Sequence, residues 1–571
     1  MTPDTKNLVA AASLSMMVLI GWQLYFVEPE LEAQRDQYNQ AQQANDLPSA
    51  SQNEAASTAS LLDTPARPDD NAKRISISTP LMQGSLTTKG ARIDDVTLTS
   101  YRETLEDDAQ NITLLHKISD ETPYFAEFGW IGDSGDIALP DAQTIWTADS
   151  DQLSPSNDVT LRWDNGQGLV FSRTIAVDDQ YMMTITDEVT SAVDETLRLL
   201  PYGLVRRFGT PDISDIYILH EGPIGVVDET LKERSYGDLQ DETSEFESEE
   251  DGGWIGITDK YWLTALIPDQ SQKATFSMRA LAGSEDRYQT DYLGQPLILS
   301  QGETISYQSH FFVGAKVVSM LDAYGDELSV ANFDLAVDFG WFYFLTKPFF
   351  YAIQWFSGLL GNFGLAILAF TVVIRLVLYP LANKSYRSMA KMRALSPRLQ
   401  KLREQYADDR QRLNQEMMSI YKQEKVNPAA GCLPILLQIP VFFALYKVLY
   451  VSIEMRHAPF FGWIADLSAI DPTSLWNLFG LLPYSTAAIP AFLNIGVWPI
   501  LMGLSMFLQM RLNPPPPDPV QAKIFQWMPV FFTFLLAGFP AGLVIYWTWN
   551  NTLSILQQWW ITREIAKSEA K

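Results

Sequence analysis

The residue types that usually carry out catalysis are sparse in this 571-residue chain and are poorly spaced for it. None of the four histidines pairs with another at the spacing of metal ligands, and none belongs to an H-E-x-x-H helix. The chain has no phosphate-binding glycine loop with a following lysine, and no G-x-S-x-G elbow. The single cysteine, Cys432, excludes an intrachain disulfide framework and a thiolate zinc cluster. We therefore expect no covalent catalysis and no cofactor.

The most informative polar residue is Arg375, which lies inside the apolar stretch 371–380, five residues before Pro380. On a helix that separation is about 7.5 Å. The long side chain could simply reach out to water at a membrane edge. Alternatively it marks a polar cavity, as ionisable residues within membrane spans usually do. The cavity is favoured by polar residues in other apolar stretches, namely Gln438, Asn550, Asn551, Gln557 and Gln558.

Six apolar stretches are predicted to cross a membrane and so to position these polar residues. A crossing helix needs about 20 apolar residues. The first stretch could be a cleaved signal peptide, but its final aromatics Trp22, Tyr25 and Phe26 favour a retained anchor. Glycine and proline at 538–542 divide the last region into two short spans. The expected spans are an anchor within 1–27, then 361–381, 432–451, 495–510, 524–536 and 541–561, the last three making up 495–561.

Charge is distributed very unevenly along the chain. Residues 28–340 contain 56 acidic and 20 basic side chains, whereas residues 341–571 contain 11 acidic and 20 basic ones. Eleven of those basic residues fall in 382–431, and short loops rich in lysine and arginine remain cytoplasmic. With six spans, both termini are cytoplasmic, and the acidic region and the loop 452–494 are periplasmic. The acidic balance also excludes DNA as a partner.

The acidic region divides into a linker and a domain. Residues 28–73 are poor in apolar side chains and are expected to form a flexible linker. Alternating runs such as 169–175 within 74–335 are typical of an all-β sandwich. The acid-rich run 241–251 is predicted to be a solvated loop rather than a cation site. The aromatic-rich segment 336–360 is predicted to be an amphipathic helix in the membrane interface.

The basic segment 382–431 is predicted to form a cytoplasmic helical hairpin. Ser396-Pro397 is read as a helix stop and restart, and Asp408-Asp409 as the turn. Apolar residues that include Met389 and Met392 recur at helical spacing. This stripe could pack the hairpin, or its methionines could contact varied apolar clients. The basic face could meet lipid headgroups or ribosomal RNA.

The longest motif is KVNP at 425–428 followed by GCLPILLQIPVFFALY at 431–446. Further motifs are MAKMR at 389–393, QEMM at 415–418, FPAGLVIY at 539–546, GGW at 252–254 and VDFGW at 337–341. Together they resemble the signature of the YidC membrane-protein insertases over nearly the whole chain. The resemblance implies a polytopic α-helical membrane protein with a five-helix insertase core, a periplasmic β-supersandwich, and a groove open to cytoplasm and lipid.

The resemblance also assigns roles to single residues. Arg375 matches the groove arginine of the family, Thr371 its neighbour one turn earlier, and Gln438 a groove residue of the third span. Tyr546 matches a family tyrosine, whereas Trp547 stands where many relatives carry a second tyrosine, so that packing is kept and a hydroxyl is lost. Client contacts are expected at Ile439, Phe442, Met389 and Met392.

The implied function is insertion, folding and assembly of inner-membrane proteins, without an enzymatic reaction. Expected partners are nascent membrane proteins, the Sec translocon and the phospholipid bilayer. Tethering of the ribosome by the tail is doubtful, because 562–571 has only three basic and two acidic residues. A solute transporter would need inverted repeats, and a carbohydrate-processing enzyme a pair of catalytic carboxylates; neither feature stands out. The segment 475–495 has no functional interpretation.

Overall fold

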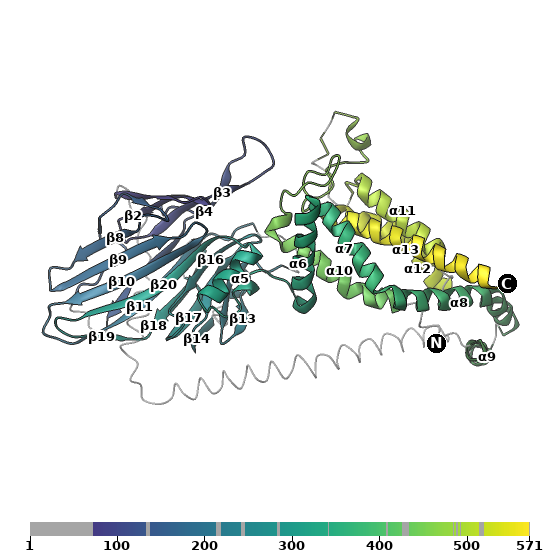
Figure 1. Ribbon diagram of the computed structural model, residues 1–571, viewed down its shortest axis with the longest axis horizontal. Helices are drawn as coiled ribbons and strands as arrows, with labels where there is room; N and C mark the ends of the chain where they lie inside the picture. The colour runs from purple at the N-terminus through teal and green to yellow at the C-terminus, as the bar shows by residue number, and fades with distance from the viewer. Residues whose placement is uncertain are drawn as a thin grey trace.

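The chain forms a β-rich part followed by a helical part (Figure 1). The computed structural model describes residues 72–132, 137–212, 219–240, 246–281, 286–340, 342–406, 409–424, 433–483, 485–486, 489–490, 493–512 and 519–569. The predicted first span and almost all of the predicted linker lie outside the described residues.

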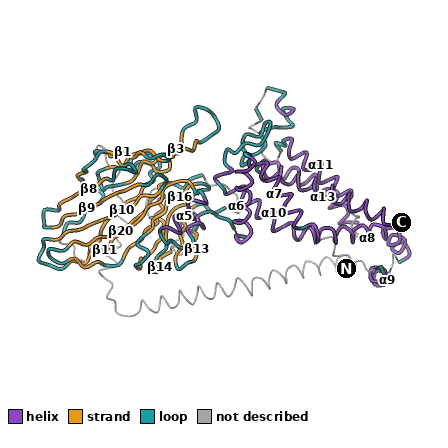
Figure 2. Tube along the Cα trace, in the orientation of Figure 1, coloured by secondary structure: helices purple, strands orange, loops and turns teal. Residues whose placement is uncertain are grey.

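Twenty strands within residues 74–315 form two sheets (Figure 2). The eleven-stranded sheet has the spatial order β14 (Phe246–Asp251), β17 (Lys273–Ala280), β18 (Arg287–Gly294), β11 (Leu197–Phe208), β5 (Tyr124–Gly132), β3 (Ile93–Arg102), β2 (Met82–Thr87), β1 (Arg74–Ser78) and β7 (Gln152–Leu153), with β19 (Leu297–Leu299) on β11 and β4 (Asn111–Leu115) on β3. The nine-stranded sheet has the order β13 (Thr230–Glu233), β12 (Gly222–Val227), β15 (Trp254–Thr258), β16 (Trp262–Ile267), β20 (Thr304–Ala315), β10 (Met182–Ser191), β9 (Leu169–Val177), β8 (Val159–Asp164) and β6 (Thr147–Ala148).

The two sheets pack face to face over a shared apolar core. Every second residue of β9 is buried, as the alternating run 169–175 predicts. The ring of Phe128 on β5 meets that of Phe311 on β20 at a centroid distance of 5.9 Å. The prediction of a β-sandwich is confirmed to this extent: the domain is rich in strands, although α4, α5 and most of η3 also lie within 74–335.

The acid-rich run is only partly described, and there the loop prediction is wrong. Residues 246–251 form β14, an edge strand paired with β17, whereas 241–245 lie outside the described residues. Along β14 the residues alternate, so that Glu247 and Glu249 are exposed. Backbone pairing with β17 outweighs the local charge, and charged side chains on an edge strand discourage pairing with another chain.

The helical part begins with a helix against the β-rich part and ends far from it (Figure 1). Its helices are α6 (Tyr343–Leu360), α7 (Phe363–Val377), α8 (Tyr379–Gln405), α9 (Arg410–Gln423), α10 (Leu433–Val451), α11 (Val497–Leu512), α12 (Pro519–Leu535) and α13 (Ala541–Glu569). Short helices are α4 (Tyr236–Leu239), α5 (Val318–Glu327), η3 (Phe333–Ala336), η5 (Ile453–Met455), η6 (Leu478–Gly480) and η7 (Leu536–Gly538). The turn expected at 538–542 separates η7 from α13.

The predicted helix break at Ser396-Pro397 is wrong, because Pro397 lies inside α8. The chain bends instead by 68° between α7 and α8. Pro380 stands in the first turn of α8, where a proline without an N–H costs no helical hydrogen bond. The hairpin turn lies where it was predicted, since the side chain of Asp409 accepts a hydrogen bond from the Arg412 amide at 3.0 Å and caps α9.

Within the described residues, no single helix is both long and apolar enough to cross a membrane. The bent pair of Phe363–Val377 and Tyr379–Leu395 meets the requirement together. Shorter apolar helices are Gln438–Val451, Val497–Leu512 and Ala522–Gly538. The six membrane spans therefore stay a prediction.

Ion pairs connect the two parts of the molecule. Lys347 on α6 lies 2.8 Å from Asp322 on α5 and 2.6 Å from Asp334 on η3. Lys447 on α10 lies 2.8 Å from Asp338. These contacts fix the start of the helical part against the last helices of the β-rich part.

Candidate functional site

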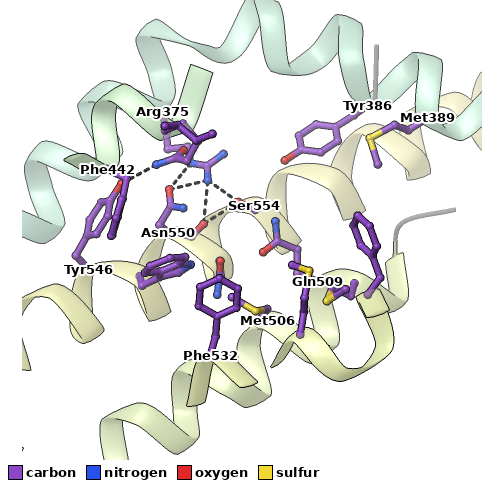
Figure 3. Close-up of a pocket in the computed structure, with 17 residues that line it drawn as sticks. Arg375, Tyr386, Met389, Phe442, Met506, Gln509, Phe532, Tyr546, Asn550 and Ser554 are labelled. Carbon is purple, nitrogen blue, oxygen red and sulfur yellow. Dashed lines mark hydrogen bonds between the residues drawn. The ribbon is translucent and has the colours of Figure 1, made fainter. Parts of the chain in front are cut away.

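A groove of about 370 Å³ opens among α7, α8, α10, α11, α12 and α13 (Figure 3). Seven of the residues predicted from the sequence line it: Arg375, Gln438, Tyr546, Trp547, Ile439, Phe442 and Met389. These residues come from four helices that are far apart in the sequence. The fold thus assembles most of the predicted set around one cavity.

Two predicted residues do not belong to the described lining. Thr371 is buried in α7, and its hydroxyl donates to the carbonyl of Ile367 at 2.6 Å. Met392 is half-buried on α8, outside the groove. This hydrogen bond engages the threonine hydroxyl with the backbone of its own helix.

Arg375 is held by α13 through neutral groups alone. Its Nε donates to Asn550 Oδ1 at 3.0 Å. Its Nη2 donates to Asn550 Oδ1 at 2.6 Å, to the Asn550 carbonyl at 3.1 Å and to Ser554 Oγ at 2.5 Å (Figure 3). Among the described residues no carboxylate pairs with this guanidinium, so its positive charge is oriented but not neutralised. This placement favours the cavity interpretation of Arg375 over simple reach to water.

The groove wall beside Arg375 combines a polar pair with an aromatic cluster. The Nε2 of Gln438 donates to the hydroxyl of the buried Tyr546 at 2.6 Å. The ring of Trp547 packs on Phe442 at 4.6 Å and on Phe532 at 5.6 Å between centroids. Trp547 therefore keeps the packing expected of an aromatic residue at this position.

Four methionines from three helices also line the groove. They are Met389 on α8, Met506 and Met510 on α11, and Met528 on α12. Flexible thioether side chains adapt to apolar surfaces of different shape. The groove thus has one wall that offers hydrogen bonds and a cation, and another that is soft and apolar.

Sequence reasoning missed the residues that orient Arg375. Asn550 was noted only as a polar residue within a span, and Ser554 was not noted at all. The available signal is spacing, because Tyr546, Asn550 and Ser554 stand four residues apart and so share one face of a helix. The same spacing joins Trp547 to Asn551.

The described lining offers hydrogen-bonding groups, one cation and apolar surface. The described lining contains no acid, histidine or cysteine. Within the described residues, no group of three or more His, Cys, Asp or Glu side chains could hold a metal ion. The arrangement suits reversible contact with a segment that carries both polar and apolar groups.

Two protein-family profiles match successive parts of the chain. The profile of the YidC periplasmic domain matches residues 74–352, and that of the 60Kd inner membrane protein matches residues 355–569. The protein named "Membrane protein insertase YidC" from Bradyrhizobium diazoefficiens is 48% identical over 598 residues, covering 99% of this chain and 97% of the relative. The protein of the same name from Granulibacter bethesdensis is 48% identical over 571 residues, covering 98% of each.

A solved structure described as an active YidC insertase with its first transmembrane domain resolved is also similar. It covers 86% of this chain and 93% of its own, with 17% sequence identity and a TM-score of 0.36.

Proposed function

Because this chain belongs to the YidC family of membrane-protein insertases, we propose that it moves the hydrophilic tails of client proteins through the groove around Arg375. The chain is an inner-membrane protein with a periplasmic domain, and membrane-protein insertion is its function. The observation that carries the proposed mechanism is the state of Arg375: a half-buried cation in an open groove, whose partners within the described part of the chain are all neutral.

The polar wall lowers the cost of carrying a tail into the bilayer. A hydrophilic tail that crosses an intact membrane must leave water over about 30 Å of hydrocarbon. Gln438, Asn550 and Ser554 offer hydrogen bonds that replace part of that water. Arg375 adds attraction for acidic residues on the tail, because charge-assisted hydrogen bonds are the strongest kind. No nucleotide is needed, since burial of the client's apolar helix in lipid supplies the driving force.

The apolar wall leads the client's hydrophobic helix towards lipid. Ile439 lines the groove and is also 44% exposed on the outer face of α10. Phe443, 44% exposed, and Phe531 on α12, 61% exposed, continue this surface outside the groove. We expect the client helix to slide between α10 and α12, with Phe442 and Met389 as further contacts.

The proposed orientation follows from charge. Six spans with a five-helix core place both termini and the basic α8–α9 hairpin in the cytoplasm, where a client first arrives. The hairpin, rather than the short tail, is then the element able to contact a ribosome. Met392 is a candidate client contact there. Cooperation with the Sec translocon is a further expectation.

Crosslinking tests this mechanism directly. A photoreactive residue at Gln509, which lines the groove, should crosslink to the hydrophilic tail of a stalled client. The matched control is Leu504 on the same helix, which is 53% exposed and lies outside the groove lining. Crosslinks to the tail from both positions equally, or from neither, would show that the tail takes another route.

A further inference from the structure

A compact loop beside the start of α11 carries an unusual apolar surface. The loop, residues 473–483, is called here the apolar finger, and it projects from the helical part (Figure 1). Six of its large apolar side chains are exposed: Leu475, Trp476, Leu478, Phe479, Leu481 and Leu482. Leu481 is 82% exposed. Apolar patches of this kind mark contact with protein or membrane.

The backbone of the finger is hydrogen-bonded within the loop. Five successive amides, from 478 to 482, each donate to a carbonyl of residues 474–478 at 2.7–3.3 Å. The Asn477 side chain accepts a further bond from Gly480 at 2.9 Å, and the Trp476 indole donates to the Leu493 carbonyl at 2.7 Å. In water the backbone N–H and C=O groups of a loop can form hydrogen bonds with the solvent. In lipid these groups must form hydrogen bonds within the protein.

The finger holds an unfavourable backbone conformation that turns apolar residues outward. Leu478 and Phe479 have φ values of 50° and 59°, in the left-handed region that side chains other than those of Gly, Asn and Asp rarely adopt. Both side chains are nevertheless exposed, at 49% and 40%. The strained conformation places these apolar side chains on the surface, where they add nothing to the packing of the core. We take this as an indication that they contact something outside the chain.

The base of the finger is fixed to a helix whose exposed face is apolar. The amide of Leu475 donates to the Ile495 carbonyl at 2.8 Å, and the amide of Val497 donates to Thr473 Oγ1 at 2.9 Å. Below this joint α11 exposes Leu501, Leu504 and Leu508. No charged residue or histidine occurs between Asp471 and Arg511. The finger is therefore joined directly to a helix that exposes apolar residues, and the whole segment between Asp471 and Arg511 is uncharged.

We propose that the apolar finger inserts into the lipid interface of the membrane and anchors the end of α11 there. Tryptophan is suited to this boundary, because its ring is apolar and its N–H is polar. The internally satisfied backbone favours lipid over water, and the continuity with α11 favours lipid over a separate protein partner. The orientation proposed above decides which leaflet the finger enters, but contact with lipid does not depend on it.

Quenching by spin-labelled lipids tests the proposal in the full-length protein. Cys432→Ser removes the only native cysteine, and Leu481→Cys then receives an environment-sensitive fluorophore. The protein is reconstituted in vesicles of phosphatidylethanolamine and phosphatidylglycerol. We expect lipids with a nitroxide near the headgroup to quench the probe several-fold more than aqueous iodide does. The matched control is Ile298→Cys on β19, 53% exposed and far from the helices, where iodide should quench more.

The outcomes separate lipid from other occupants. Quenching of the probe at 481 by iodide to the same extent as at 298 would overturn the proposal. So would shielding that appears only when protein density in the vesicles is raised, since that result identifies a second copy. Client insertion by the labelled protein is measured in parallel, so that failure of the groove mechanism is distinguished from failure of the finger.

Discussion

The β-rich part buries arginines and the helical part half-buries Arg375, and the two parts treat the arginine charge in opposite ways. In the β-rich part, Arg173 donates to both oxygens of Asp187, at 2.7 and 3.0 Å, and Arg92 donates to Glu127 at 2.6 Å. In the helical part, the partners of Arg375 among the described residues are the neutral groups of Asn550 and Ser554. A buried charge that is paired is satisfied within its own domain, whereas a charge that is oriented but not neutralised remains able to attract a ligand.

The sharpest test of this comparison is stability. Asp187→Ala leaves the Arg173 guanidinium buried, with 1% of its side chain exposed and its carboxylate partner lost. We expect the free energy of unfolding of the β-rich part to fall by about 3–5 kcal/mol. The loss of unfolding free energy caused by Arg375→Ala should be far smaller, because this substitution leaves no buried partner charge behind. Thermal unfolding in detergent measures both.

A double substitution serves as the control. Replacing Arg173 and Asp187 together by Met and Leu removes the ion pair without leaving a charge, and should restore most of the lost stability. An equally severe loss in the double variant would show that packing, and not the charge, accounts for the effect of Asp187→Ala.

The boundary between the two parts contains a buried carboxyl group, that of Glu454. Glu454 on η5 lies near the first amide of α5, and both its carboxylate oxygens are buried without a well-formed hydrogen bond among the described residues. Burial raises the pKa of Glu454 to about 7, and the N–H groups of Glu454 and Val318 partly oppose this shift. The folded state, in which the two parts are in contact, therefore favours the protonated form of Glu454.

The sign of the resulting pH dependence follows from this raised pKa. Between pH 4.5 and about 7 the folded state keeps a proton that the unfolded state has lost, so the free energy of unfolding falls as pH rises through that window. The full effect is about 3 kcal/mol. Glu454→Gln should remove this component and be the more stable protein at pH 8. Parallel stability curves for the two proteins between pH 5 and 8 would contradict the assignment.

Removing the hydrogen-bond partner of Arg375, while keeping the arginine, should have a smaller effect. We expect it to change the insertion rate and not the stability. Asn550→Ala removes the side-chain acceptor of Nε and Nη2, so the guanidinium is no longer fixed over the groove. A lost hydrogen bond of this type is worth about 1–2 kcal/mol, or roughly tenfold in the rate for a client with an acidic tail. The matched control is Asn551→Ala at the adjacent position of α13, which breaks the 3.0 Å hydrogen bond from Asn551 to Ser505.

The smallest effect is expected at Trp547. Trp547→Tyr keeps an aromatic ring against Phe442 and Phe532, and should change the insertion rate by no more than about twofold. Trp547→Ala should slow insertion more, because it opens the aromatic wall. A large gain with tyrosine would show that a hydroxyl at this position contributes to the groove.

The periodic parts of the fold could be predicted from the sequence, because burial follows local spacing. The run at 169–175 became a strand, and Asp409 caps a helix after the predicted turn. Local rules failed where distant contacts decide the outcome. Composition alone suggested a loop at 241–251, yet pairing with β17 makes part of it a strand. Pro397 did not end its helix.

The candidate site shows the same limit. Arg375 and Gln438 could be singled out because polar residues in apolar stretches are rare. Their partners could not, because hydrogen bonds between residues 175 positions apart, such as that from Arg375 to Asn550, depend on how the helices pack. The family resemblance suggested Thr371 as a groove residue, but this residue is buried and its hydroxyl donates to the carbonyl of Ile367.

The measurement that tests the central claim most directly is protease protection of two clients that differ only in the charge of the translocated tail. The assay uses vesicles with equal amounts of the native protein, Arg375→Lys or Arg375→Ala. We predict that Arg375→Ala slows the acidic-tailed client several-fold and the uncharged one much less. Arg375→Lys should be milder, since it keeps the charge but loses the planar fork. Equal slowing of both clients by Arg375→Ala would contradict the role of an unneutralised charge in the groove.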